Sequence, residues 1–153
     1  MVTKRGGKAG CWVLIGLVLF SPLSLSAADR LQIRLGDTGI VYWETRIPEP
    51  FTFPLRHRNS IYDVWVEERF QTDQCGRIHL TAVRTSSPAV LEYYGLETAS
   101  ADWISLSRSF DKISLLVSKR GRTSLLFDQG ALWLSDQLPE GTRIEIRVFP
   151  VQE

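Results

Sequence analysis

Apolar and polar residues alternate with a period of two along most of this chain after residue 30. Such alternation is typical of β-strands that bury one face and expose the other. Turn-forming residues separate the apolar runs, as at Gly36-Asp37, Cys75-Gly76 and Gln129-Gly130. We therefore expect strands near residues 31–35, 40–43, 51–56, 62–70, 78–82, 104–106, 113–117, 125–127, 131–134 and 144–148.

One short helix is predicted, from Pro88 to Tyr94. Ser87 can cap its first turn, Pro88 suits the first helical position, and Gly95 can end the helix. About ten short strands with one helix predict an all-β fold. The fold is either a β-sandwich or a partly open β-barrel, formed by a single domain over residues 29–153.

The first 28 residues follow a different pattern. Basic residues at positions 4, 5 and 8 precede an apolar stretch from Cys11 to Phe20, and small residues follow up to Ala28. These are the three parts of a secretory signal. The apolar stretch is about half as long as the roughly twenty residues that a membrane-spanning helix needs. We therefore expect a signal peptide over residues 1–28 and a periplasmic or otherwise extracytoplasmic domain. An uncleaved membrane anchor is the alternative.

Removal of this leader changes the net charge. The full chain carries 18 basic and 17 acidic residues, a formal charge of +1, and loss of three basic residues gives 15 − 17 = −2. A nucleic-acid partner would require a basic face, so none is expected.

Cys75 is the only cysteine after the leader, so it cannot form a disulfide within residues 29–153. It lies in a predicted turn. The alternatives are an intermolecular disulfide and an inert thiol beneath the turn, and we favour the second. A single cysteine excludes a cysteine-rich zinc site.

The densest polar cluster lies between residues 56 and 68. Arginine side chains bind carboxylates through two parallel hydrogen bonds, so this segment predicts a binding edge for a partner surface or an anionic small molecule. Alternatively, the arginines pair with the glutamates across neighbouring strands. Trp65 lies on the polar face of its segment and is expected to be an aromatic anchor. The candidate binding residues are Arg56, Arg58, Asn59, Ser60, Trp65, Glu67 and Glu68.

Catalysis and metal binding are less favoured. His57, Ser60 and a carboxylate are ingredients of nucleophilic catalysis, so a hydrolase is one alternative. The chain contains no Gly-x-Ser-x-Gly elbow, and we expect no catalytic residues. A metal site would require His57 and His79 to converge with a carboxylate, and no ligand spacing is recognisable. We therefore expect no metal and no cofactor.

The stretch from Phe53 to Phe70 resembles the signature of the domain-of-unknown-function 1850 family. In that family a hydrophobic strand runs into a His-Ser-aliphatic step, and a Val-x-Glu or Val-Glu-Glu step follows. Here Ser60-Ile61 and Val66-Glu67-Glu68 match, and Asn59 stands at the histidine position. Residues 132–138, Gly141 and 144–148 resemble the family's closing segment.

This resemblance implies a role rather than an activity. Members of the family are small exported or membrane-anchored proteins associated with TAXI-type TRAP transporters, which use an extracytoplasmic solute receptor. The implied function is that of a non-catalytic accessory protein that docks on the membrane permease or the solute receptor. The alternative is a stand-alone binding module for an anionic small molecule. The oligomeric state stays open.

Overall fold

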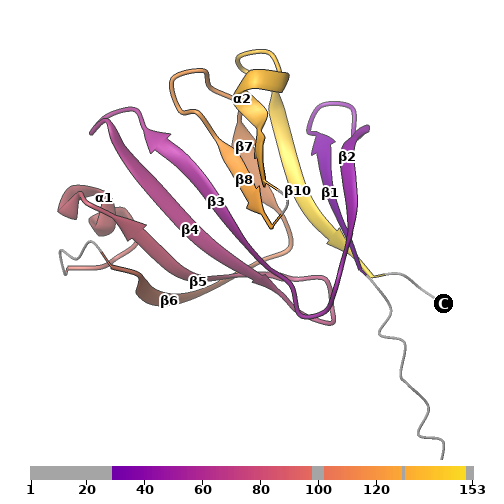
Figure 1. Ribbon diagram of the computed structural model, residues 1–153, viewed down its shortest axis with the longest axis horizontal. Coiled ribbons are helices and arrows are strands. Elements are labelled where there is room, and N and C mark those ends of the chain that lie inside the picture. Colours follow the sequence, from indigo (N-terminus) through magenta and orange to yellow (C-terminus); the bar gives the residue numbers. More distant parts are fainter. Residues whose placement is uncertain (1–28, 98–101, 129, 151–153) are drawn as a thin grey trace, which may run out of the picture.

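The computed structural model describes residues 29–97, 102–128 and 130–150, and it confirms the all-β fold (Figure 1). The predicted leader, residues 1–28, lies outside the described residues. The strands are β1 (Asp29–Leu35), β2 (Val41–Ile47), β3 (Thr52–Asn59), β4 (Val64–Thr72), β5 (Ile78–Thr85), β6 (Ile104–Phe110), β7 (Ile113–Leu116), β8 (Ser124–Phe127), β9 (Gly130–Trp133) and β10 (Arg143–Phe149). The helices are α1 (Pro88–Tyr93) and α2 (Leu134–Gln137).

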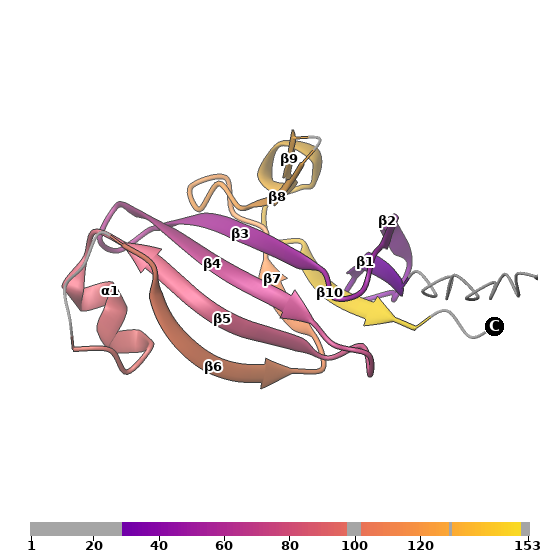
Figure 2. The same ribbon diagram turned by 60° about the horizontal axis from the view of Figure 1, so that its bottom comes forward.

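The strands form two antiparallel sheets. The order is β2-β1-β10-β7 in the four-stranded sheet and β6-β5-β4-β3-β8-β9 in the six-stranded sheet. Figure 2 shows the long strands β3 to β6 as one twisted layer. Among the described residues the sheets do not close into a barrel, so the sandwich alternative of the prediction holds.

The core lies between the two sheets. Leu31 and Ile33 of β1 and Ile144 and Ile146 of β10 are fully buried, as the period-two pattern predicts. Phe53 of the six-stranded sheet is also fully buried. Each such side chain contributes about 1.5–3 kcal/mol when it leaves water, so this layer is the main source of stability.

The predicted helix is confirmed as α1. The Ser87 hydroxyl accepts a hydrogen bond from the Val90 N–H at 3.4 Å, and Pro88 occupies the first turn. Val90 and Leu91 pack against Val66 and Val83, so the helix covers part of the inner face of the six-stranded sheet. The second helix, α2, was not predicted. No helix among the described residues is long and apolar enough to span a membrane.

Candidate functional site

The predicted binding residues do not form an edge. Strands β3 and β4 are interior strands, because β8 and β5 pair with their other sides. In the β3–β4 register Arg56 lies opposite Glu67 and Arg58 lies opposite Trp65. Neighbouring side chains along a strand leave opposite faces of the sheet, so the seven residues divide among three places.

The first place is the outer face of the six-stranded sheet, where Glu67 lies between two arginines. Arg56 of β3 and Arg84 of β5 are its direct cross-strand neighbours. Arg56 Nε lies 3.5 Å from Glu67 Oε1, and Arg84 Nη2 donates to Glu67 Oε2. The predicted cross-strand pairing of arginine with glutamate is thus confirmed for Arg56. The Glu67 side chain is 17% exposed and that of Arg84 is 43% exposed, so a partner would meet mainly the guanidinium groups.

Two tryptophans flank these ion pairs. The guanidinium carbon of Arg56 lies 4.2 Å from the centroid of the Trp65 ring. Arg69 and Arg84 lie over Trp103, at 4.1 and 4.9 Å from its ring. Such contacts stabilise by about 0.5–1 kcal/mol each at exposed sites. We name these residues the outer-face cluster: Arg56, Trp65, Glu67, Arg69, Arg84 and Trp103.

Sequence reasoning missed half of this cluster. Arg69 alternates with Trp65 and Glu67 along β4, so the strand pattern alone could have identified it. Arg84 and Trp103 join the cluster only through the pairing of β5 with its neighbours, and the sequence carries no signal for that register.

The outer-face cluster is positively charged and open. Its three arginines and one glutamate give a formal charge of 3 − 1 = +2. The helix α1 packs on the inner face of this sheet, and no described element packs over the cluster. An open recess of about 240 Å³ lies between Trp65, Glu67 and Arg84. The arrangement is chemically suited to binding carboxylates.

The second place is the β3–β4 turn, which contains Arg58, Asn59 and Ser60. Asn59 Oδ1 accepts hydrogen bonds from the N–H groups of Ile61 and Tyr62 at 3.0 and 3.1 Å. Arg58 Nη2 donates to Asp63 Oδ2 at 2.7 Å. The side chains of Arg58 and Asn59 therefore hold the turn in shape, and Ser60 is exposed beside them.

The third place is the inner face, where Glu68 lies with His57. The Tyr94 hydroxyl donates to Glu68 Oε1 at 2.9 Å, and His57 Nδ1 lies 3.9 Å from Glu68 Oε2. Burial raises the pKa of Glu68 and lowers the pKa of His57. Burial, together with the neighbouring Glu68, raises the pKa of Tyr94. Arg108 Nη2 donates to the Tyr94 carbonyl at 2.8 Å and brings a positive charge to this group.

A recess of about 300 Å³ opens beside His57. Ser60 of the turn and Ser118, which precedes β8, also line it. The described residues contain no hydrogen bond between Ser60 and His57, and the 3.9 Å distance from His57 to Glu68 is too long for one. A hydrogen-bonded Ser-His-carboxylate arrangement is therefore not assembled in this part of the chain.

The two histidines do not converge. His57 lies opposite Val66 of β4, and His79 lies opposite Gln71, five residues farther along the same strand. His79 Nε2 lies 2.7 Å from Asp73 Oδ2, and its Nδ1 lies 2.8 Å from the Ser109 hydroxyl. Within the described ranges, no group of three His, Cys, Asp or Glu side chains could hold a metal ion.

The expectation that the Cys75 thiol lies beneath its turn is wrong. Cys75 is free and exposed. The Asp73 carboxylate accepts the N–H groups of Cys75 and Arg77, both at 2.9 Å, and so holds the turn from one side. Gly76 is the residue that the turn buries, because its Cα lies against the end of β10.

Another recess is one that sequence reasoning did not predict. It has a volume of about 440 Å³ and lies between β2 and the β8–β9 hairpin. Trp43 and Phe51 stack on Phe127 in its wall, with ring centroids 5.1 and 6.4 Å apart. These rings come from three separate segments, so no local pattern brings them together.

Comparisons with known proteins identify no relative: no family model, no curated protein and no solved structure matches the chain.

Proposed function

We propose that this protein is an exported, non-catalytic accessory protein that docks on a partner protein through the outer-face cluster. The observation that carries the proposal is the assembly of two tryptophans and three arginines on a sheet face that no described element covers. Tryptophan and arginine are the residues most enriched at the energetic centres of protein interfaces.

The cluster is also organised in advance of binding. Trp65 and Trp103 are held by arginines of the same sheet, and Glu67 orients two of those arginines. Side chains that are already ordered lose less conformational freedom on association, which favours binding. The formal charge of +2 favours an acidic partner surface whose carboxylates accept hydrogen bonds from the guanidinium groups.

The partner that we propose is the membrane permease or the solute receptor of a TAXI-type TRAP transporter. Two features of the sequence support this choice: the resemblance of residues 53–70 to the domain-of-unknown-function 1850 family, and the leader-like pattern of residues 1–28. Both favour a location outside the cytoplasm, where such a partner is reached.

Photocrosslinking in cells tests the docking surface. A photoreactive amino acid at position 65 should capture the permease or the receptor, identified by mass spectrometry. The matched control carries the same amino acid at position 44, where Glu44 is exposed on the other sheet and pairs with Arg30 at 3.7 Å. Equal capture from both positions, or capture from position 44 alone, would contradict the proposal.

A transport assay tests whether solute uptake depends on docking through the outer-face cluster. The double variant Arg56→Ala/Arg84→Ala should reduce solute uptake while the protein stays folded, as judged by circular dichroism. The matched control is Arg30→Ala/Glu44→Ala, which removes an exposed ion pair from the four-stranded sheet. Normal uptake in the Arg56/Arg84 variant would remove the support for docking through this cluster.

The recess beside Arg84 favours a second candidate, a stand-alone binding module for an anionic small molecule. A thermal-shift screen with small carboxylates distinguishes the two. A ligand at a hundred times its Kd stabilises the folded state by about 2.7 kcal/mol. A shift that disappears in Arg84→Ala would favour the small-molecule module, and the absence of any shift across the panel would favour the docking protein.

A further inference from the structure

Exposed apolar side chains gather at one end of the sandwich. Six large hydrophobic residues of the described chain are exposed, and Ile61 and Leu116 are the most exposed of them, at 74% and 62%. All six lie in or beside the β1–β2 hairpin, the β3–β4 turn, the end of β7 or helix α1: Ile40, Val41, Ile61, Tyr62, Tyr93 and Leu116.

Contacts join three of these places into one surface: the β3–β4 turn, the β7–β8 loop that follows the end of β7, and helix α1. The Arg58 N–H donates to the Gly121 carbonyl at 2.6 Å, which ties the β3–β4 turn to the β7–β8 loop. The Tyr62 and Tyr93 rings lie 6.5 Å apart, which ties the same turn to α1. Leu116 lines the recess that Ser60 also lines.

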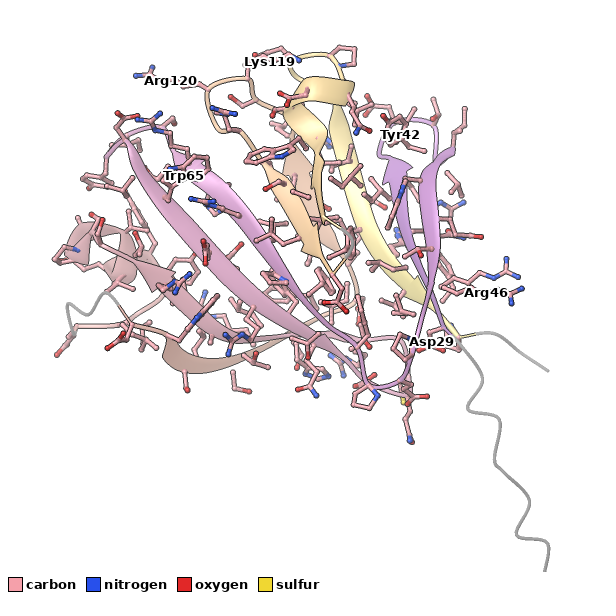
Figure 3. All side chains as sticks on the ribbon, viewed as in Figure 1. Asp29, Tyr42, Arg46, Trp65, Lys119 and Arg120 are labelled. Carbon is pink, nitrogen blue, oxygen red and sulfur yellow. The ribbon has the colours of Figure 1, made fainter. Side chains whose placement is uncertain are left out.

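Basic residues stand beside the apolar ones. The β7–β8 loop contains Lys119, Arg120 and Arg122, all exposed. Lys119 has partners at both ends: its backbone N–H donates to Glu140 Oε2 at 3.0 Å, and its Nζ donates to the Ser135 carbonyl. Arg120 is therefore the basic residue that presents its charge to the surroundings at this point of the loop. Figure 3 shows Lys119 and Arg120 at the end of the molecule opposite Asp29, where the described chain begins. We name this surface the loop tip: Ile61, Tyr62, Tyr93, Leu116, Lys119 and Arg120.

We propose that the loop tip contacts the surface of an anionic lipid bilayer. Its apolar side chains come from separate elements, the β3–β4 turn, helix α1 and the end of β7, so a broad, deformable surface can contact them together. Ile61 and Leu116 would enter the boundary between headgroups and acyl chains, and the tyrosines suit the interface because each has an apolar ring and a polar hydroxyl. Arg120 would meet lipid phosphates.

This contact is independent of the outer-face cluster. The cluster lies on a sheet face and the loop tip lies at the end of the sandwich, so a protein resting on a membrane through its loops keeps the cluster available to a neighbour. Failure of one proposal leaves the other standing.

Flotation with lipid vesicles tests which residues of the loop tip contribute to membrane binding. The full chain should bind vesicles of phosphatidylethanolamine and phosphatidylglycerol more tightly than vesicles of phosphatidylcholine. Ile61→Ser/Leu116→Ser should weaken binding at least about tenfold, because two large apolar groups stay in water. Arg120→Ser should weaken binding to the anionic vesicles about fivefold.

The matched control for charge is Arg46→Ser, an exposed arginine on β2 that lies outside the loop tip. It should leave binding unchanged. Every sample retains residues 1–28, so any contribution of that apolar segment is common to all. No binding by the parent chain, no weakening in the Ile61/Leu116 variant, or an equal loss in Arg46→Ser would overturn the proposal.

Crosslinking in membranes tests the orientation. A benzophenone side chain at position 61 should form lipid adducts detectable by mass spectrometry. The same group at position 111 should not, because Asp111 pairs with Arg77 of the β4–β5 turn at 3.8 Å, away from the loop tip. Equal lipid labelling from both positions, labelling from 111 alone, or capture of protein without lipid from 61 would overturn the proposal.

Discussion

Arg56 lies over the indole of Trp65, although Trp65 is paired with Arg58 in the β3–β4 register. The contact is therefore diagonal across the two strands, which the length of an arginine allows. Arg58 turns instead to Asp63, at 2.7 Å. This choice of partners separates the residues that shape the β3–β4 turn from those that shape the outer face.

A double-mutant cycle measures the Arg56–Trp65 contact. Arg56→Ala, Trp65→Leu and the double variant should show a coupling of about 0.5–1 kcal/mol in the free energy of unfolding, as expected for an exposed cation–π contact. Urea unfolding followed by circular dichroism gives the three values. Strict additivity would show that the contact does not stabilise the folded state.

The hydrogen bond from Tyr94 to Glu68 should stabilise the folded state more than the Arg56–Trp65 contact does, because Glu68 is largely buried. Tyr94→Phe removes the hydroxyl donor and leaves the Glu68 carboxyl group without this hydrogen bond. The expected cost is about 1–3 kcal/mol in the free energy of unfolding. The adjacent Tyr93 is 61% exposed and is a matched control. Tyr93→Phe should change stability by less than about 0.5 kcal/mol. Similar losses of stability in the two variants would show that the hydrogen bond to Glu68 does not stabilise the folded state.

The alternation of residues predicted the elements of the fold but not the sites on it. Ten predicted strand segments and one helix were found because a one-sided sheet leaves a period-two pattern in the sequence. The same pattern places Glu68 on the face of Val66 and Phe70, yet the prediction grouped it with Glu67 as one charged surface. Trp103 joined the outer-face cluster only through the register of β5 and β6, which is a property of the whole sheet.

Acidification should destabilise the folded state through the buried His57. Burial lowers the pKa of His57 below its ordinary value of 6.5. The stability that neutral His57 contributes is therefore present at pH values above 6.5 and is lost as the pH falls through its folded-state pKa. Burial raises the pKa of Glu68 above 4.5, so its contribution is present below 4.5 and is lost as the pH rises through its folded-state pKa. The two residues therefore act in opposite directions.

Unfolding by urea at several pH values between 5 and 8 separates the two residues. His57→Gln has no histidine to protonate at this position and so does not lose stability in this way. The stability of the variant relative to the parent should therefore rise as the pH falls below about 6.5. Glu68→Gln keeps His57 and should still lose stability on acidification. A constant difference between His57→Gln and the parent across this range would show that His57 is not held in its neutral form by burial.

Two glycines allow backbone strain to be separated from steric contact. Gly76 and Gly39 have similar positive φ angles, 75° and 70°, so alanine at either position carries a left-handed strain of about 1–2 kcal/mol. At Gly76 the added Cβ would lie 3.0 Å from the Val148 carbonyl oxygen and 3.2 Å from Pro150 Cδ, whereas at Gly39 nothing lies within 4 Å. Gly76→Ala should therefore lose about 1–3 kcal/mol more than Gly39→Ala in urea unfolding. Equal losses would mean that the β4–β5 turn moves freely away from β10, and a smaller loss in Gly76→Ala would contradict the close packing of this turn against the last strand.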